Sequence, residues 1–514
     1  MTAIHMRRKP ARKVASRCDF ATVRRGAGLL ALAGVAALAG CAVGPDFKKP
    51  AAPEGDYTAR PAAAGVAAEG ALAGAEQRFT SGADIAADWW TLFHSPPLND
   101  LIDLALKNNA DLKAARAALS VARESVLAQR GAYFPNVSGS FSATRQSLSG
   151  QIAPTLSSNA YTYNLYTPEL DVSFVPDVFG LNRRTMESLR AEEQEARYQM
   201  VATYVTLTAN VVVTAIQEAS LRRQVETTQQ LIESGTHALE VLRYQREKGY
   251  ASGLDVAAQE SQLAQFAATL PPLARQLAQL RDLLATLTGR FPNQQPATGI
   301  DLATLTLPEE MPLSLPAALI EQRPDVRQAE ANLHDASAKI GIAIANRLPN
   351  LELTGSVGSA AAAMDQLFKS GTGFWAIGAT ATAPIFQGGT LLHQERAAKA
   401  AYRQAAEQYR STVLQAFQNV ADSLAALQSD ADGLKAASTA AAAAKVTLDL
   451  AERQWHDGYA GYVAYLSAEQ ANQQSQIALV EAEASRLADS AALFQALGGG
   501  WWHRADLAAG YHEK

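Results

Sequence analysis

The sequence contains one series of short motifs twice, about 210 residues apart. The motifs keep their order, and the offset between partners varies only from 208 to 214. Repeats of solenoid proteins are much shorter, about 20–50 residues, so the pattern indicates two copies of a half-domain. The matched pairs are Asn109-Ala110-Asp111-Leu112 with Arg323-Pro324-Asp325-Val326, Phe134-Pro135-Asn136 with Leu348-Pro349-Asn350, Pro176 and Gly180 with Pro384 and Gly388, Gly249-Tyr250-Ala251 with Gly458-Tyr459-Ala460, and Leu287-Thr288-Gly289 with Leu497-Gly498-Gly499.

Residues 1–40 have the composition of a secretion signal. Eight basic residues precede an apolar run from Gly26 to Gly40, which is shorter than the roughly 20 residues that span a membrane as a helix. The run ends in Leu38-Ala39-Gly40-Cys41, which is typical of a bacterial lipoprotein in which Cys41 is lipidated and becomes the mature N-terminus. A plain secretory signal with an incidental cysteine is the alternative. The non-acidic Ala42 favours sorting to the outer membrane.

Cysteine content and charge exclude several classes of function. Cys18 lies in the signal and Cys41 is the expected lipid site, so no thiol is left for a disulfide, a metal or a nucleophile. The chain has a formal net charge of −5. The signal carries eight basic residues and one acid, so its removal leaves a net charge of −12. Such a charge gives no general reason to bind nucleic acid.

Motifs of catalysis and metal binding are missing from the sequence. The eight histidines are scattered without the spacing of a metal site, and no nucleophile elbow, Walker loop or zinc-protease motif occurs. Gly371-Thr372-Gly373 lacks the third glycine and the following helix of a dinucleotide site. We therefore predict a protein that is not an enzyme and has no metal and no cofactor beyond the covalent lipid on Cys41.

Each half predicts the order helix, strand, loop, strand, long helix, turn, helix. The first helix is expected from Leu98 to Ala132, because Pro135 disfavours helical geometry before it. The strands show an alternation of period two that is typical of membrane β-strands, although a half-buried soluble hairpin has the same pattern. Pro168 predicts a bulge or bend. The expected strands cover residues 137–144, 161–174, 351–357 and 374–385, and Tyr161, Tyr163, Tyr166, Phe374 and Trp375 would suit an aromatic girdle.

The number of strands carries an argument about assembly. No uninterrupted apolar stretch of membrane-spanning length follows Cys41, so we expect any crossing of a bilayer to use β-strands in a closed barrel. The chain supplies four strands, whereas membrane barrels begin at about eight. A transmembrane barrel would therefore be shared between chains.

The long helices show a sustained heptad pattern. The expected helix from Leu181 to Glu247 would be about 65 residues long, or on the order of 100 Å at 1.5 Å per residue, which suits a structure that crosses a wide aqueous space. Heptad spacing is typical of coiled-coil packing. The apolar positions are Val201, Val205, Thr208, Val212, Ala215 and Ala219 in the first half, and Val413, Phe417, Val420, Leu424, Leu427, Leu434, Ala441, Leu448 and Trp455 in the second.

The two long helical hairpins turn at similar tips. One turn is Lys248-Gly249-Tyr250 and the other is Asp457-Gly458-Tyr459, and glycine permits the positive φ that reverses the chain. Charged residues gather near both. Solvated loops are one interpretation, and a docking or gating surface, which the duplication favours, is the other.

These signals divide the chain into five parts. Residues 1–40 are the signal, 41–88 a lipidated tether rich in Ala, Gly and Pro, 89–297 the first repeat, 298–500 the second repeat and 501–514 a tail. Trp89-Trp90 and Leu92-Phe93 are expected to anchor the start of the core.

Several motifs in a fixed order resemble those of TolC-like outer-membrane efflux factors, in particular the lipoprotein branch that serves RND-type pumps. The resemblance covers essentially all of the expected mature chain. The motifs are Cys41-Ala42-Val43-Gly44-Pro45-Asp46-Phe47, Leu170-Asp171-Val172-Ser173-Phe174 with Asp177-Val178-Phe179-Gly180, Arg323-Pro324-Asp325-Val326-Arg327 with Gly341 and Pro349-Asn350-Leu351, and Ala496-Leu497-Gly498-Gly499-Gly500-Trp501.

The resemblance implies a mixed fold of membrane β-strands and long coiled-coil helices. It implies a homotrimer in the outer membrane, with a 12-strand barrel, a tunnel of helices reaching into the periplasm and short strands midway. It implies a passive conduit for drugs or other small solutes that meets a periplasmic adaptor protein and an inner-membrane RND-type pump.

The resemblance also implies roles for residues at the tips. Lys248, Gly249, Tyr250, Asp457, Gly458 and Tyr459 fall on the turns that touch the adaptor in relatives. Relatives often carry an apolar residue before each glycine, where this chain has Lys248 and Asp457. Some relatives have an acidic gate after the second turn, where this chain has Ala464 and Ser467. Candidate gate residues are therefore Asp255, in the first half, and Tyr462 and Tyr465, which would act sterically.

Three other functions remain open from the sequence. The exit duct of a type I protein or peptide secretion system shares the same fold. A periplasmic adaptor is also lipidated and rich in helical hairpins, but a duplicated frame with two pairs of amphipathic strands argues against it. An enzyme is the most distant alternative.

Overall fold

The computed structural model describes residues 42–51, 56–57, 71–147, 162–296 and 299–508, so Cys41 and Tyr161 lie outside the described residues. The chain divides into two compact units. The first comprises Met1–Pro45, Ala128–Met186 and Ala338–Ala398, and the second comprises Asp46–Leu127, Glu187–Ser337 and Lys399–Lys514. Each unit therefore contains segments from both halves of the sequence.

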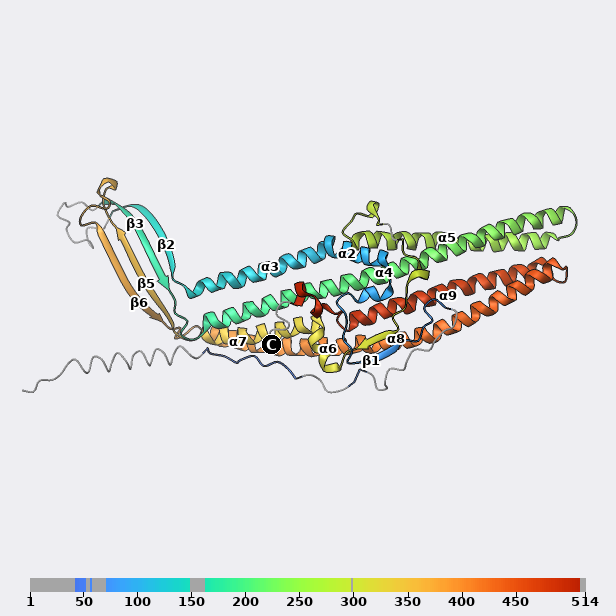
Figure 1. Ribbon diagram of the computed structural model, residues 1–514. Coiled ribbons are helices and arrows are strands. Elements are labelled where there is room, and N and C mark those ends of the chain that lie inside the picture. Colours follow the sequence, from blue (N-terminus) through green and yellow to red (C-terminus); the bar gives the residue numbers. More distant parts are fainter. Residues whose placement is uncertain (1–41, 52–55, 58–70, 148–161, 297–298, 509–514) are drawn as a thin grey trace, which may run out of the picture. The chain divides into compact units, whose positions relative to one another are not determined.

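The first unit contains a four-stranded antiparallel sheet. Its strands are β2 (Asn136–Ser147), β3 (Thr162–Phe174), β5 (Asn350–Ser359) and β6 (Gly373–Thr382), paired in that order (Figure 1). All four strands predicted from the period-two pattern are present. In the described part of the chain, β2 and β6 each pair on one side only, so both long edges of the sheet are open.

The prediction of a bulge at Pro168 is wrong for the β2–β3 ladder. The register between these strands is uninterrupted from Asn136 opposite Ser173 to Ser147 opposite Thr162, and Pro168 lies opposite Phe141. The irregularity falls on the other side, where β3 and β5 pair regularly only from Glu169 onward, with one further bridge at Tyr166. Proline lacks an N–H, and the gap in this second ladder accommodates the missing donor.

Two long helical hairpins continue the fold. The first consists of α4 (Leu181–Glu247) and α5 (Gly253–Leu287), and the second of α8 (Thr390–His456) and α9 (Tyr462–Ala496) (Figure 1). Both outgoing helices have 67 residues and both returning helices have 35. The length predicted for α4 is confirmed.

The two hairpins are aligned by a constant offset of 209 residues, which corrects two of the matched motif pairs. Gly180 corresponds to Gly389, rather than to Gly388, because both precede the long helix and accept the hydrogen bond of its first turn from Arg184 and His393. Gly289 corresponds to Gly498, because both follow the returning helix with positive φ. Doubled glycines at Gly388-Gly389 and Gly498-Gly499 made the sequence alignment ambiguous by one position.

The predicted heptad stripes form the core of the second unit. All six positions in α4 are at most 4% exposed. In α8, Val413, Val420, Leu424, Leu427, Leu434 and Ala441 are buried, while Phe417, Leu448 and Trp455 are half-buried. Trp89, 1% exposed, stacks on Phe494 of α9 with ring centroids 5.0 Å apart, which confirms its predicted role as an anchor.

One helix of the described residues, α4, has a window long and apolar enough to cross a membrane. The sequence prediction concerned uninterrupted apolar stretches, and polar residues interrupt α4 throughout its length. Two thirds of the window is buried inside the protein (67%), as expected for the core helix of a packed bundle. The stripe residues of α4 and apolar neighbours such as Leu207, Val211 and Ile216 belong to the buried core, so packing against other helices accounts for them.

The single helix predicted from Leu98 to Ala132 is wrong, because it is two helices. These are α2 (Pro96–Asn108) and α3 (Ala110–Arg130), separated by Asn109, whose ψ of 131° leaves the helical region. The Asn109 side chain then caps α3 by accepting a hydrogen bond from the Leu112 N–H at 2.9 Å. The second half has the same break at Arg323, between α6 (Pro316–Gln322) and α7 (Pro324–Ala345).

The residues of this break close each helical hairpin by an equivalent contact. In the first half the Asn109 side chain donates to the Leu287 carbonyl at the end of α5 (3.1 Å). In the second half Arg323 donates to the Ala496 carbonyl at the end of α9 (2.9 Å). A Cβ on Gly289 would lie 2.5 Å from the Asn108 carbonyl oxygen, and one on Gly498 would lie 2.7 Å from the Gln322 carbonyl oxygen. The duplicated motifs therefore encode the junction between helices.

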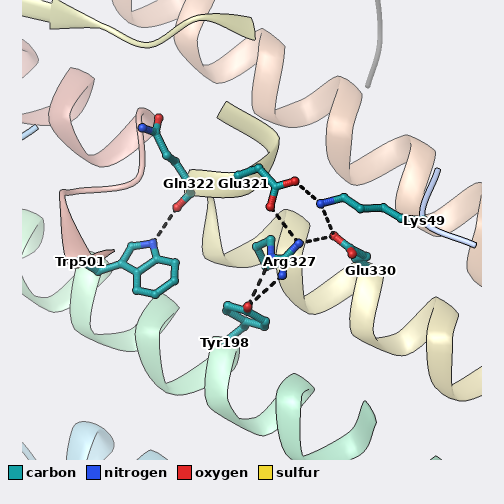
Figure 2. Close-up of polar contacts among 7 residues, drawn as sticks. All are labelled: Lys49, Tyr198, Glu321, Gln322, Arg327, Glu330 and Trp501. Atoms are coloured by element: carbon teal, nitrogen blue, oxygen red, sulfur yellow. Dashed lines mark hydrogen bonds and ion pairs between the residues drawn. The ribbon is translucent and has the colours of Figure 1, made fainter. Parts of the chain in front are cut away.

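The second copy of this junction is reinforced by polar contacts (Figure 2). The Trp501 indole N–H donates to the Gln322 carbonyl at 2.7 Å. Arg327 bonds Glu330 (2.7 Å), Glu321 (3.1 Å) and the Tyr198 hydroxyl (3.1 Å). Lys49 pairs with the same two carboxylates, so the segment around Lys49 is held on α6 and α7.

Residues 77–85 are packed against the rest of the fold, whereas the sequence predicts a tether there. Strand β1 (Arg78–Ser81) pairs in parallel with β4 (Glu310–Leu313), and Gln77 and Ile85 are each 1% exposed. The sequence prediction missed this packing because β1 has only four residues and no apolar alternation. The remaining short elements are 3₁₀ helices η1 (Trp89–Phe93), η2 (Gly131–Tyr133), η3 (Pro292–Gln294), η4 (Leu302–Thr304), η5 (Met364–Gln366) and η6 (Trp501–His503), and helix α10 (Ala505–Ala508).

Two glycine substitutions should affect stability in opposite directions. In Gly500→Ala, the positive φ of 68° and a Cβ in collision with the Ala86 carbonyl should destabilise the fold by about 2–5 kcal/mol. In Gly433→Ala, the Cβ meets open space inside α8 and should stabilise the helix by about 0.5–1 kcal/mol. Thermal unfolding of both variants checks this, and a neutral Gly500→Ala would contradict the contact.

Candidate partner-binding tips and gate

The turns that join the long helices have the same hydrogen-bonded geometry. At the first tip, Gly249 N–H donates to the Arg246 carbonyl (3.0 Å) and Tyr250 N–H to the Gln245 carbonyl (2.8 Å). At the second tip, Gly458 N–H donates to the Trp455 carbonyl (3.1 Å) and Tyr459 N–H to the Gln454 carbonyl (2.8 Å). This is the Schellman motif, which satisfies the last carbonyls of a helix.

Glycine is required at both turns because the backbone has a positive φ there, and not because a larger side chain would collide with a neighbour. Gly249 has φ of 80° and Gly458 has φ of 77°, and a Cβ on either would meet nothing within 4 Å. Surrounding space is therefore open, and the tips project their side chains into solvent. Tyr250 is 85% exposed and Tyr459 is 86% exposed. Two large exposed aromatic groups in equivalent places are typical of a protein-binding surface.

The tips differ in charge although their backbones match. Residues 243–255 carry three basic and two acidic side chains, and the equivalent residues 452–464 carry one basic and two acidic. Lys248 lies over the Tyr244 ring, 5.3 Å from its centroid, and both are exposed. The equivalent of Lys248 is the exposed Asp457. The first tip is therefore net positive and the second net negative.

Asp255, a candidate gate residue, caps a helix. Ser252 is the N-cap of α5, and its hydroxyl accepts a hydrogen bond from the Asp255 N–H (3.2 Å). The Asp255 carboxylate accepts in return from the Ser252 N–H (2.9 Å), which completes a capping box. Hydrogen bonds from the Ser252 side chain and backbone lower the pKa of Asp255. This contact gives Asp255 a structural role at the start of α5.

The second tip has an aromatic cluster in place of that cap. Its N-cap is Gly461, which has no side chain to accept a hydrogen bond. Trp455 of α8 packs on Tyr465 of α9, with centroids 5.4 Å apart and planes 21° apart, and on Tyr462 at 5.0 Å. Burial is the largest cause that raises the pKa of both tyrosines. The sequence marked Trp455 only as the last heptad position, although its place opposite two tyrosines identifies it as the centre of the cluster.

The aromatic cluster also connects the two hairpins. Tyr462 packs against the apolar group formed by Leu239, Leu242 and Val256 of the first hairpin. Further from the tip, Gln262 of α5 donates to Gln470 of α9 at 2.9 Å. The candidate gate residues Tyr462 and Tyr465 thus lie where one hairpin meets the other.

Glu469 is a further site residue that the sequence did not single out. It is 9% exposed on α9, and burial is the largest cause that raises its pKa, opposed by a hydrogen bond with Ser234 of α4. Its equivalent in the first hairpin is the exposed Glu260. Its neighbours in the sequence, Ala468 and Gln470, did not distinguish it from a solvated residue.

The described residues offer no group of three or more His, Cys, Asp or Glu side chains placed to hold a metal ion. The contacts at the tips are hydrogen bonds, aromatic packing and exposed charge. Such an arrangement can bind a protein partner and can hold two helical hairpins together. Long paired helices together with strands long enough to cross a membrane are compatible with an outer-membrane channel protein.

Comparison with known proteins agrees with this class. The family described as "Outer membrane efflux protein" matches residues 101–290 and 315–499. The chain therefore belongs to the outer membrane efflux protein family, whose members are channels of efflux pumps rather than enzymes.

Individual relatives cover nearly the whole chain. The probable efflux pump outer membrane protein TtgC of Pseudomonas putida is 31% identical over 479 residues, which are 92% of this chain and 95% of TtgC. The outer membrane protein OprJ of Pseudomonas aeruginosa is 28% identical over 486 residues, with 92% and 96% covered.

Solved structures share the fold. The outer-membrane channel OprN matches with a TM-score of 0.78 and 26% identity, over 90% of this chain and 100% of OprN. The open state of the MtrE outer membrane channel of Neisseria gonorrhoeae matches with a TM-score of 0.75 and 27% identity, over 90% and 99%. The chain is an outer-membrane efflux channel protein.

The aromatic cluster should control the order of the second tip. In Trp455→Ala the two ring contacts to Tyr462 and Tyr465 are lost, at about 0.5–1.5 kcal/mol each. Amide exchange of residues 457–466 should then accelerate by roughly tenfold or more, while residues 248–255 change less. Tyr459→Ala, which removes an exposed ring from the same turn, is the matched control. Equal exchange in both variants would show that the cluster does not order the tip.

Proposed function

We propose that this protein is the outer-membrane channel of a tripartite efflux system and acts as a passive conduit for small solutes. The observation that carries the proposal is the four-stranded sheet with two open edges. Its strands have 12, 13, 10 and 10 residues, and a membrane-crossing strand needs about 9–11. The backbone groups along the edges of β2 and β6 have no partner strand in the described chain, and lipid supplies none.

Closure of the barrel requires other copies of the chain. Val137 and Phe141 of β2 and Trp375 and Ile377 of β6 are 57–82% exposed, which suits strands that face lipid. Three chains would supply 12 strands, within the range of membrane barrels, and 12 long helices for a tunnel. A homotrimer with a shared barrel is therefore the proposed assembly, which is also the assembly that the family resemblance implies.

The tips are the proposed contact with a periplasmic adaptor protein and, through it, an inner-membrane RND-type pump. Lys248, Gly249, Tyr250, Asp457, Gly458 and Tyr459 form the surface, with Tyr250 and Tyr459 as its exposed anchors. Asp255, Tyr462 and Tyr465 remain the proposed gate residues, with Trp455 added by the ring contacts. Relatives are named for toluene, antibiotic and solvent efflux, which supports small organic solutes as cargo.

Pore formation tests the conduit directly. Purified full-length protein should run as a crosslinked trimer and should give discrete conductance steps in planar lipid bilayers. Deletion of the gene should increase susceptibility to small toxic solutes and leave exported proteins unchanged, whereas the reverse result would favour a type I secretion duct. A monomer without conductance would overturn the proposal.

Opposite charges at the tips should select the partner. Lys248→Glu makes the first tip negative like the second, and the lost attraction to an acidic partner residue should weaken adaptor binding by roughly tenfold or more, or about 1.4 kcal/mol. Tyr244→Phe keeps the ring beneath Lys248 and is the control. Adaptor affinity measured by surface plasmon resonance at two salt concentrations checks this. An affinity that changes neither with the substitution nor with the salt concentration would contradict it.

A lipid on Cys41 is the proposed anchor in the outer membrane. Metabolic labelling with a fatty acid should mark the wild-type protein and not Cys41→Ser. The mass of the mature N-terminus should begin at Cys41, because cleavage and lipidation are linked in lipoproteins. Labelled Cys41→Ser, or a mature chain beginning elsewhere, would contradict this anchor.

A further inference from the structure

A pair of carboxyl groups joins the two helices of the second hairpin. The side chain of Asp430 on α8 interacts with that of Asp489 on α9 through a hydrogen bond, which raises the pKa of Asp430. The Oδ2 atom of Asp430 is buried and accepts no hydrogen bond from any described group. Two carboxylates this close repel when both are ionised, so the pair is stable when one proton is shared between them.

The pair lies beside a buried arginine that holds the N-terminal region. Arg486 is 0% exposed and precedes Asp489 by one helical turn on α9. It donates to the carbonyls of Ala73 (2.8 Å) and Ala75 (2.9 Å) and to the Gln77 side chain (3.4 Å). We call residues 71–81 the docked segment. All three acceptors of Arg486 belong to it.

Two further hydrogen bonds join the docked segment to α9. The Gln77 amide donates to Ser490 (2.9 Å), and the Leu72 N–H donates to Glu483 (2.9 Å). Arg486 is thus the one described side chain of α9 that gathers several backbone carbonyls of the segment. A change in the charge felt by Arg486 therefore acts directly on how the segment is held.

The charged groups that face Asp430 lie on α9. Asp489 and Arg486 face it from α9, and the Arg486 charge also feels Asp430. The docked segment reaches Arg486 with carbonyls and an amide, none of them charged. Glu483, the next acid on α9, is turned to Leu72, with the charge of Arg223 on α4 acting on it. Asp430 therefore has one nearby acid and one nearby base.

Protons can reach the pair from solvent. Asp489 lines an open groove of about 620 Å³ between α4, α5 and α9. The groove is otherwise lined by amides, hydroxyls, a few apolar side chains and Glu481, and it contains no basic residue. An open groove with acidic side chains allows the shared proton to exchange with bulk water.

We propose that Asp430 and Asp489 form a proton-operated latch that holds α8, α9 and the docked segment together. With one proton shared, a hydrogen bond links α8 to α9, and the single negative charge leaves Arg486 on the carbonyls of the segment. When the proton is lost, two negative charges repel across the hairpin. The added charge also draws Arg486 toward the pair and away from Ala73 and Ala75.

The direction of the pH effect follows from the environment of Asp430. Burial first, and then the hydrogen bond and charge of Asp489, raise the pKa of Asp430 to about 7. An acid with a raised pKa in the folded state stabilises that state while it is protonated. Its contribution falls as the pH rises from the usual aspartate range through about 7. The latch is therefore closed in mildly acidic conditions and loosens in mildly alkaline ones.

Hydrogen exchange of the full-length protein in detergent tests the latch. Protection of residues 71–81, corrected for the pH dependence of chemical exchange, should fall by roughly tenfold between pH 6 and pH 8 in the wild type. In Asp430→Asn the amide donates to Asp489 permanently, so protection should stay constant. Asp432→Asn, an exposed acid on the same helix, should behave as the wild type.

A second measurement follows the proton itself. Infrared difference spectra of the wild type between pH 6 and pH 8 should show the loss of one protonated carboxyl band that is absent from Asp430→Asn. Constant protection in the wild type, or the same pH-dependent loss in Asp430→Asn, would overturn the latch. If Asp430→Asn does not fold, a wild-type spectrum without this band overturns it instead.

Discussion

The fold depends on the contact that returns each long hairpin to the start of its repeat. A helix of 35 residues comes back from a tip and ends at a carbonyl that is bound by one side chain, Asn109 in the first half and Arg323 in the second. A glycine with positive φ then passes so close to a neighbouring carbonyl that no Cβ fits. The contact fixes where both helices end, and so it fixes the length of the hairpin.

Equal lengths have a consequence at the tips of the hairpins. Because both copies use 67 and 35 residues between equivalent junctions, each tip forms at the same position in its hairpin, with the same Schellman hydrogen bonds. Divergence between the copies is then confined to side chains. The first tip has Lys248 where the second has Asp457. The first tip also has the capping box of Asp255, where the second has the rings of Trp455, Tyr462 and Tyr465, although the backbones match. A partner that binds both tips must distinguish them by their side chains, because their backbones have the same shape.

The sequence predicted the parts of this structure that repeat with a period. Heptad stripes placed the buried faces of α4 and α8, and alternation placed all four strands of the sheet. The sequence prediction failed where a single residue determines the local structure. Asn109 breaks a helix through its own backbone and side chain, and the signal for it was Pro324 at the equivalent place in the second half. Asp430, Arg486 and Asp489 have no motif, because they are far apart in sequence or look like ordinary surface charges, and only packing makes them neighbours.

The two units place different demands on assembly. The helical unit buries its stripes within one chain, and its polar junctions are satisfied by groups of the same chain. The sheet has long strands, apolar side chains that face outward and two edges with unpaired backbone groups. In water such edges invite uncontrolled pairing, and in lipid they leave hydrogen-bonding groups without any partner. In the proposed assembly, edges of other chains would complete these strands, whereas the helices need only groups of their own chain. Such a division would allow the helical unit to complete its hairpins and its contacts with residues 71–81 before the sheet enters the membrane.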